Sequence, residues 1–291
     1  MPTPDLTAGE RVYSLDELAG DDAVRPRGDM TGHPRDRVRV LDLFSGRGAV
    51  GLALHTFFKR WPQPHQLTGD FIGVDKEDFS EDYPGRFLQH DVANLTLDDL
   101  PIDEKVDLVW ASPPCQPYAK GSHQHYENLP EDHPLPSIPD LNLHEVCNRL
   151  GRNYVIENVP GCSDLRDDRI VKVNGAAFGL PINFERHFEV SFYDEFRRHG
   201  TEDYRAPLPP DIIQFQTATI DQLLRGKAIP PEHMDKRSWN QSEARAAIPP
   251  NYVTFILSHC PALDELTTPS GSLQWWSSVA LETGQHAITH Y

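Results

Sequence analysis

The feature that most constrains the fold is an alternation of short apolar runs and segments of helical periodicity in the first 180 residues. The apolar runs predict strands at 38–44, 71–74, 86–90, 106–110 and 153–156. Apolar residues at helical spacing predict helices over 49–61 and 142–150. Strands that alternate with helices indicate βαβ units. We therefore expect an α/β domain on a parallel sheet, with functional residues at the carboxyl ends of its strands.

Composition limits the classes of protein to consider. The chain has 291 residues, with 27 Lys and Arg against 44 Asp and Glu, a net charge of -17. It has no apolar run of about 18 residues, so no membrane span is expected, and the acidic N-terminus predicts no secretory signal. Four scattered cysteines without a C-x-x-C pattern indicate neither a disulfide framework nor a zinc knuckle. We expect a cytoplasmic protein.

The first motif with chemical meaning is a glycine-rich turn between a predicted strand and a predicted helix. It consists of Phe44, Ser45, Gly46, Arg47 and Gly48. Such a turn lets the backbone approach a ligand, and the helix N-terminus offers free N–H groups. The G-x-G-x-x-G spacing, completed by Gly51, also fits a nicotinamide or flavin enzyme, and a tight turn that binds nothing is a third interpretation.

Acidic residues follow the next two predicted strands. Asp75 ends the second strand and suits ribose hydroxyls, whereas Asp91 ends the third strand and suits an adenine amino group. Both positions are compatible with a nicotinamide or flavin cofactor and also with another cofactor that contains a nucleoside.

Two further motifs follow predicted strands. In Ser112-Pro113-Pro114-Cys115-Gln116-Pro117, two prolines fix the backbone just before the cysteine, which places Cys115 for nucleophilic attack better than for core packing. Glu157, in Ile156-Glu157-Asn158-Val159, follows apolar strand residues. Partial desolvation there raises a carboxyl pKa and suits proton transfer near neutral pH.

These three motifs, in this order, resemble the DNA (cytosine-5) methyltransferases of the compact phage and prokaryotic type. Phe44–Gly48 resembles the family's F-x-G-x-G cofactor loop, Pro114–Gln116 its Pro-Cys-Gln motif, and Glu157–Val159 its Glu-Asn-Val motif. Arg186 resembles the second arginine of the Gln-x-Arg-x-Arg segment, with Phe184 at the position of the first. The resemblance implies a Rossmann-like S-adenosylmethionine-dependent methyltransferase sheet.

The resemblance also implies residue roles. Cys115 is the nucleophile that attacks cytosine C6, Glu157 acts on ring N3, Asn158 fixes the loop, and Arg186 stabilises the adduct or lowers the thiol pKa. S-adenosylmethionine is the implied cofactor, and its product is S-adenosylhomocysteine. The residues implied to hold it are Phe44, Ser45, Gly46, Arg47, Gly48, Asp75, Asp91, Pro113 and Asn251. His123 and His125 lack a third ligand, so no metal is expected.

The resemblance implies four segments. Residues 1–36 form a loose N-terminal arm, 37–189 with 247–260 the catalytic domain, 190–246 a small irregular target-recognition region, and 261–291 a C-terminal tail. Double-stranded DNA is the implied partner, with no membrane, a monomeric state, and a restriction nuclease as a further possible partner. The implied substrate contacts are Gln116, Lys120, Ser122, Arg197, Arg198, Arg225 and Lys227.

An acidic chain argues against a nucleic-acid partner, because such proteins usually carry a basic surface. However, residues 186–246 hold 9 basic and 10 acidic residues, so the rest of the chain holds 18 and 34 and carries most of the excess. The alternatives are a tRNA cytosine-5 methyltransferase, an N4-cytosine methyltransferase, which would place an aromatic residue at Cys115, a non-catalytic binding module, and the nicotinamide enzyme.

Overall fold

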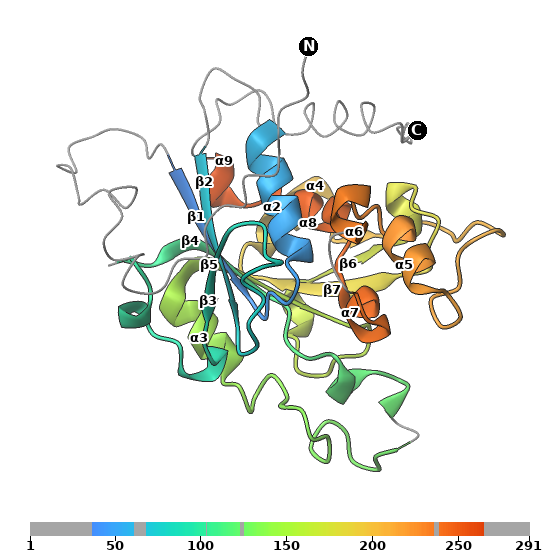
Figure 1. Ribbon diagram of the computed structural model, residues 1–291, viewed down its shortest axis with the longest axis horizontal. Coiled ribbons are helices and arrows are strands. Elements are labelled where there is room, and N and C mark those ends of the chain that lie inside the picture. Colours follow the sequence, from blue (N-terminus) through green and yellow to red (C-terminus); the bar gives the residue numbers. More distant parts are fainter. Residues whose placement is uncertain (1–36, 61–67, 103, 123–124, 236–238, 265–291) are drawn as a thin grey trace.

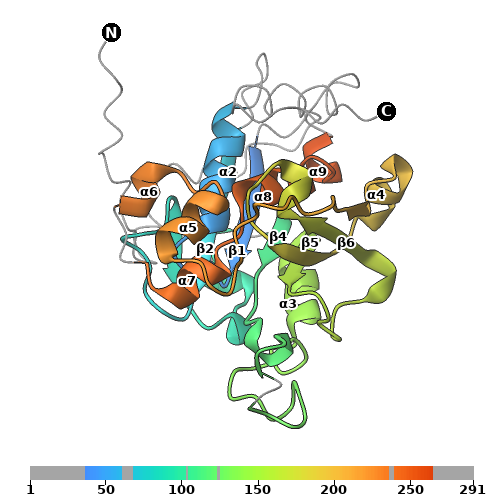
Figure 2. The same ribbon diagram turned by 90° about the vertical axis from the view of Figure 1, so that its right-hand side faces the viewer.

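The computed structural model describes residues 37–60, 68–102, 104–122, 125–235 and 239–264. The expected N-terminal arm, most of the expected C-terminal tail and His123 lie outside these residues. Figures 1 and 2 show a central sheet with helices packed on it. Within the described residues, no helix combines the length and the apolar character needed to cross a membrane.

The sheet has eight strands in the order β3-β2-β1-β4-β5-β7-β6-β8 (Figure 1). The strands are β1 (Arg37–Leu43), β2 (Thr68–Asp75), β3 (Arg86–Gln89), β4 (Val106–Ala111), β5 (Gly151–Asn158), β6 (Ile170–Asn174), β7 (Glu185–Val190) and β8 (Asp203–Tyr204). The first five are the strands that the apolar runs predict. The α/β prediction is therefore confirmed, and the chain order reverses between β1 and β4, where α/β sheets place their ligand crevice.

The parallel sheet that the sequence predicts is confirmed for its five strands, but the sheet continues into strands that the sequence does not predict. Strands β1 to β5 pair in parallel, but β7 runs antiparallel to both β5 and β6. As a result, the first residues of β7 lie beside the last residues of β5, with Asn158 opposite His187. The antiparallel strand brings Arg186 back to the edge at which the parallel strands end.

Helices cover both faces of the sheet. Their bounds are α2 (Ala49–Arg60), α3 (Leu143–Leu150), α4 (Tyr193–His199), α5 (Ile220–Gly226), α6 (Pro231–Asp235), α7 (Gln241–Ala246), α8 (Pro250–Leu257) and α9 (Pro261–Asp264). Alternate residues of β1 enter two separate cores, because side chains alternate along a strand. Val38 and Val40 pack in the core that includes α2 and α8, whereas Leu41 and Leu43 pack in the core that includes α3.

The segment 190–246 is more regular than the sequence predicts. It contains β8 and the helices α4 to α7, and β8 pairs with β6 in the same sheet. Phe196, Leu223 and Trp239 belong to the same apolar core as Val38 of β1. This segment is therefore packed onto the α/β domain and does not have a separate core.

Glycines beside β2 make room for an aromatic side chain. A Cβ atom at Gly73 would lie 2.5 Å from the ring of Tyr83, and one at Gly51 would lie 2.8 Å from it. At Gly48, a Cβ atom would lie 2.5 Å from Pro84 Cδ. Real Cβ atoms do not approach this closely, so Gly48 and Gly51 are needed for the packing of Tyr83 and Pro84. The sequence pattern attributes them to ligand approach alone.

We expect Gly73→Ala to lower the free energy of unfolding by about 1–3 kcal/mol, because the added methyl group overpacks the buried Tyr83 ring. Urea denaturation measures this effect. Gly121→Ala is the matched control, since a Cβ atom there meets nothing within 4 Å. Equal stability of the two variants would contradict the packing role of Gly73.

Candidate active site

The three sequence motifs meet at the carboxyl edge of the sheet. Leu43 of β1 pairs with Ala111 of β4, and Ala111 pairs with Ile156 of β5, so the residues that follow these strands are neighbours. The turns are also joined by backbone hydrogen bonds: Ser45 N donates to Val74 O at 3.1 Å, and Ser112 N donates to Leu43 O at 3.1 Å.

Cys115 lies at the start of a short 3-10 turn, Gln116–Tyr118, just beyond β4. Its side chain is partly exposed, whereas Cys147, Cys162 and Cys260 are buried. Burial raises the pKa of the Cys115 thiol, and the positive charges of Arg186 and Lys227 oppose this rise. The cysteine that the sequence singles out is thus the accessible one of the four. Arg186 and Lys227 favour its thiolate, whereas burial and the carboxylate of Glu157 favour the thiol.

Glu157 and Arg186 form a buried charged pair beside this cysteine. Arg186 Nε lies 2.7 Å from Glu157 Oε1, and the two side chains are 9% and 6% exposed. The N–H bond does not point at the oxygen, so neither atom has an aligned hydrogen-bond partner. Burial raises the pKa of Glu157, whereas the charges of Arg186 and Lys227 lower it. A carboxyl group held between these opposing effects is suited to gain and lose a proton.

Asn158 and Ser112 support this pair. Asn158 is fully buried, and its Oδ1 accepts a hydrogen bond of 2.8 Å from Val159 N. Its Nδ2 is buried without a partner. Ser112 lowers the pKa of Glu157, and Trp110 Nε1 donates to Ser112 Oγ at 3.1 Å. Ser112 belongs to the motif around Cys115, but the sequence does not reveal its role, because Trp110 lies within β4 and Glu157 lies on β5.

The glycine-rich turn has free space at one position. Gly46 has a φ of +49°, and a Cβ atom there would meet nothing within 4 Å. Gly46 N donates to Asp75 Oδ2 at 3.0 Å, and Glu77 N donates to Asp75 Oδ1 at 3.1 Å. Ser45 Oγ is buried without a hydrogen-bond partner. An open glycine beside a partly buried carboxylate and an unpaired hydroxyl fits a polar nucleoside ligand.

Other predicted cofactor residues have structural partners. Arg47 forms ion pairs with Asp82 and, at 2.7 Å, with Glu243 of α7. The guanidinium therefore joins the turn to α7, an arrangement that the sequence does not reveal because Glu243 lies 196 residues away.

The remaining cofactor candidates lie around the same edge. Asp91 caps the 3-10 turn Val92–Asn94 and accepts a hydrogen bond from Ala93 N. Phe44 is half-buried with a φ of 57°, Pro113 is buried, and Asn251 is half-buried in the first turn of α8.

A buried pair beneath the turn is absent from the sequence predictions. Asp42 of β1 is fully buried and accepts a hydrogen bond of 3.0 Å from the Tyr83 hydroxyl. Burial raises the pKa of Asp42 to about 8, and the hydrogen bond from Tyr83 lowers it. An acidic residue between Leu41 and Leu43 in an apolar strand is the sequence signal that identifies such a group.

Hydrogen bonds of Tyr118 fix the two ends of the segment that follows Cys115. Tyr118 Oη donates to Asp164 Oδ2 at 2.7 Å and accepts a hydrogen bond of 2.6 Å from Ile138 N. Ser122 Oγ donates to the Gln116 carbonyl oxygen at 2.7 Å, and Lys120 is exposed. The segment between Tyr118 and Ile138 thus begins and ends at one point next to the nucleophile candidate.

Three predicted substrate contacts need correction. Lys227 is 0% exposed and its amine bonds only to the protein, so it is not a surface contact to phosphate. Arg197 and Arg198 lie on α4 (Figure 2), which follows β7. Because β7 runs antiparallel to β5, α4 lies at the edge of the sheet opposite the carboxyl ends of the parallel strands. They pair with Asp194 and Glu195 on the same helix. Arg225 is exposed and pairs with Asp221, and its role as a contact stays a prediction.

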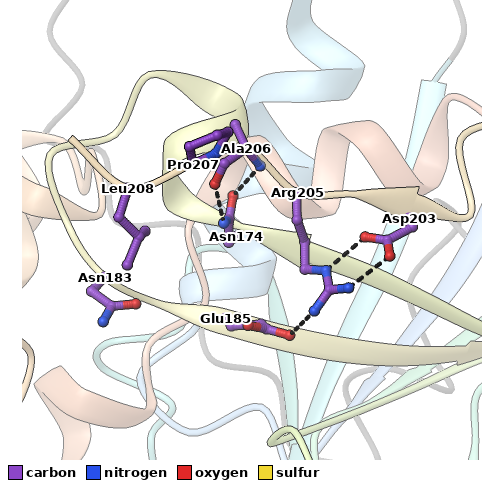
Figure 3. A pocket seen from close by; sticks show the side chains of 8 residues that line it. All are labelled: Asn174, Asn183, Glu185, Asp203, Arg205, Ala206, Pro207 and Leu208. Atoms are coloured by element: carbon purple, nitrogen blue, oxygen red, sulfur yellow. Dashed lines mark hydrogen bonds and ion pairs between the residues drawn. The ribbon is translucent and has the colours of Figure 1, made fainter.

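A separate pocket of about 540 Å³ lies at the β6–β8 edge of the sheet (Figure 3). Arg205 in this pocket pairs with Asp203 and Glu185, and Asn174 exchanges two hydrogen bonds with Ala206. Glu185 precedes Arg186 in β7, so the two side chains leave opposite faces of the strand. This pocket is therefore distinct from the site at Cys115.

Comparison with solved structures identifies the fold. The Entamoeba histolytica methyltransferase EhMeth superposes with a TM-score of 0.50 at 12% identity, covering 80% of this chain and 100% of that chain. The S. pombe Dnmt2 methyltransferase gives a TM-score of 0.47 at 14% identity, with the same coverage. No family model matches the sequence, and no curated protein matches it. The chain has an α/β fold found in methyltransferases.

We expect the buried Asp42 to make the protein less stable as pH rises. Its folded pKa of about 8 lies above the ordinary value of 3.8, so the folded state binds a proton that the unfolded state has lost. Stability from this group is complete below pH 4 and is lost as pH rises towards 8. Asp42→Asn removes this loss of stability. We expect its free energy of unfolding to exceed that of the wild type by about 2–5 kcal/mol between pH 5 and pH 8.

Urea denaturation at several pH values measures the difference. Asp78→Asn is the control, because Asp78 is exposed and its hydrogen bonds to Ser80 lower its pKa. An Asp42→Asn variant whose stability runs parallel to that of the wild type over this pH range would contradict the assignment.

Proposed function

We propose that this protein is an S-adenosylmethionine-dependent methyltransferase that methylates C5 of cytosine in double-stranded DNA. The observation that carries the proposal is the meeting of an accessible Cys115 with the buried Glu157–Arg186 pair at the carboxyl edge of the sheet. The resemblance of the three motifs to the cytosine-5 methyltransferases and the methyltransferase fold support it.

Cys115 starts the reaction. Cytosine C5 is a weak nucleophile, and attack of the Cys115 thiolate on C6 forms a C–S bond and gives C5 enamine character. The positive charge of Arg186 favours the thiolate over the thiol. The target base must first leave the duplex, which costs a few kcal/mol.

Glu157 and Arg186 act on the charge that the attack creates. Glu157 protonates or hydrogen-bonds ring N3, which withdraws electrons from the ring as the C–S bond forms. Burial raises the pKa of Glu157, which favours the protonated carboxyl group that this role needs. After methyl transfer, the C5 proton leaves to solvent as the C–S bond breaks, and N3 returns its proton to Glu157. These steps restore the aromatic ring and the Cys115 thiolate.

S-adenosylmethionine supplies an electrophilic methyl group on a sulfonium sulfur. Gly46, Ser45 and Asp75 would hold it, since the turn combines open space, an unpaired hydroxyl and a carboxylate. Arg47 contributes by fixing the turn to Glu243 of α7.

We expect Cys115→Ala to reduce methyl transfer by a factor on the order of 10⁴ or more, because the covalent route is lost. Binding of S-adenosylmethionine, measured by calorimetry, should stay close to the wild-type value. Glu157→Gln should lower turnover on the order of 10²–10⁴-fold, because the amide cannot give a proton to N3. Cys147→Ala is the control, since Cys147 lies on the buried face of α3. A Cys115→Ala variant that still methylates would refute the nucleophile.

The nucleic acid is tested with labelled cofactor. Duplex DNA and tRNA are offered in parallel at low and multimolar salt, and the modified base is identified by mass spectrometry. We expect 5-methylcytosine in DNA. Label in tRNA alone would replace DNA by RNA as the substrate, and label on the exocyclic amino group would refute C5 chemistry.

A further inference from the structure

Lys227 is a fully buried lysine next to the candidate active site. It follows α5 directly and is 0% exposed. Lysine is almost never fully buried unless its charge is compensated. The compensation around Lys227 therefore indicates what the side chain does.

Three backbone carbonyls surround the amine. Lys227 Nζ donates to the carbonyl oxygens of Ala244 at 2.9 Å, Arg245 at 2.8 Å and Ala247 at 2.7 Å. A neutral amine has two hydrogens and would turn its lone pair towards one of these oxygens, whereas an ammonium group has three hydrogens and satisfies all of them. The three carbonyl oxygens therefore favour the charged form, against the effect of burial. Positive charge is also favoured at the C-terminal end of a helix, here α7.

The same amine lies beside the charged pair. Lys227 Nζ is 3.9 Å from the centre of the Phe184 ring, and the guanidinium carbon of Arg186 is 3.7 Å from that centre. Phe184 is itself fixed, because its carbonyl accepts a hydrogen bond from the Tyr252 hydroxyl of α8. One aromatic ring thus joins the lysine to Arg186, and the carbonyls join the lysine to the turn that precedes α8.

We propose that Lys227 is a positioning residue of the active site, whose buried ammonium group fixes Phe184 and Arg186 and supplies a second positive charge that favours the Cys115 thiolate. The role in turnover rests on the proposed function. The effect on the thiol does not, since it is a property of the folded protein.

Burial opposes the charge of Lys227, and the neighbouring charged groups act on it in both directions. Burial and Arg186 lower the pKa of Lys227, while Glu157 and Cys115 raise it. In return, the charge of Lys227 lowers the pKa of Cys115 and of Glu157 against the effect of burial. The thiolate and the ammonium group stabilise each other.

The test measures the reactivity of Cys115 itself. The rate at which iodoacetamide modifies Cys115 is followed against pH by peptide mass spectrometry, in the full chain. We expect Lys227→Met to raise the midpoint of this profile by about one pH unit. Turnover at pH 7 should then fall roughly tenfold, with a smaller change in KM. Lys227→Arg keeps the charge and should return the midpoint towards the wild-type value.

Lys105→Met is the matched control. Lys105 also donates to a carbonyl of a helix C-terminal turn, that of Asn148 in α3, but its side chain is exposed and lies at the opposite edge of the sheet. The Lys105→Met variant should leave the pH midpoint of Cys115 alkylation and the turnover unchanged. A folded Lys227→Met protein with the wild-type midpoint would overturn the proposal and leave Lys227 a purely structural residue.

Phe184→Leu keeps the test decisive if Lys227→Met does not fold. It removes the ring that joins both cations and leaves the carbonyl bonds of Lys227 in place. A raised midpoint supports the proposal, and an unchanged one overturns it. A protein that shows the shift with Lys227→Met but methylates no cytosine would support the positioning role and refute the proposed function.

Discussion

The site depends on the buried pair between Glu157 and Arg186. Glu157 is the last residue but one of the parallel strand β5, and Arg186 is the second residue of the antiparallel strand β7 beside it, so the contact forms where the sheet changes direction. Removing one partner of such a pair leaves an uncompensated buried charge, which destabilises a protein by about 3–5 kcal/mol. The antiparallel β7 therefore both completes the sheet and places the guanidinium beside Cys115.

Two further cations near this pair, Lys227 and Arg47, also have partners that compensate their charge. Lys227 adds a cation over Phe184, and its amine is satisfied by carbonyls at the end of α7. Helix α7 also supplies Glu243, which holds Arg47 of the glycine-rich turn. The segment interpreted as a separate recognition region is thus tied to both halves of the proposed site, through Lys227 on one side and Glu243 on the other.

The glycine-rich turn illustrates how one pattern serves two purposes. Gly46 leaves open space above a carboxylate, which suits a ligand, whereas Gly48 and Gly51 give way to Tyr83 and Pro84. Tyr83 in turn reaches the buried Asp42 beneath the turn. Spacing between glycines could not separate these uses, because the residue that fills the space lies more than thirty positions further along the chain.

The sequence by itself determined the first five strands, the helices that separate them, and the placement of Cys115 and Glu157 at strand ends. These follow from apolar runs and helical spacing, which are local properties of the chain. Only the tertiary structure decided the direction of β7, the burial of Lys227 and the position of Arg197 and Arg198 at the far edge. Each depends on contacts between segments that are distant in the sequence. A basic residue by itself predicts a contact to nucleic acid, but burial and pairing with acidic or carbonyl groups decide whether it is available for one.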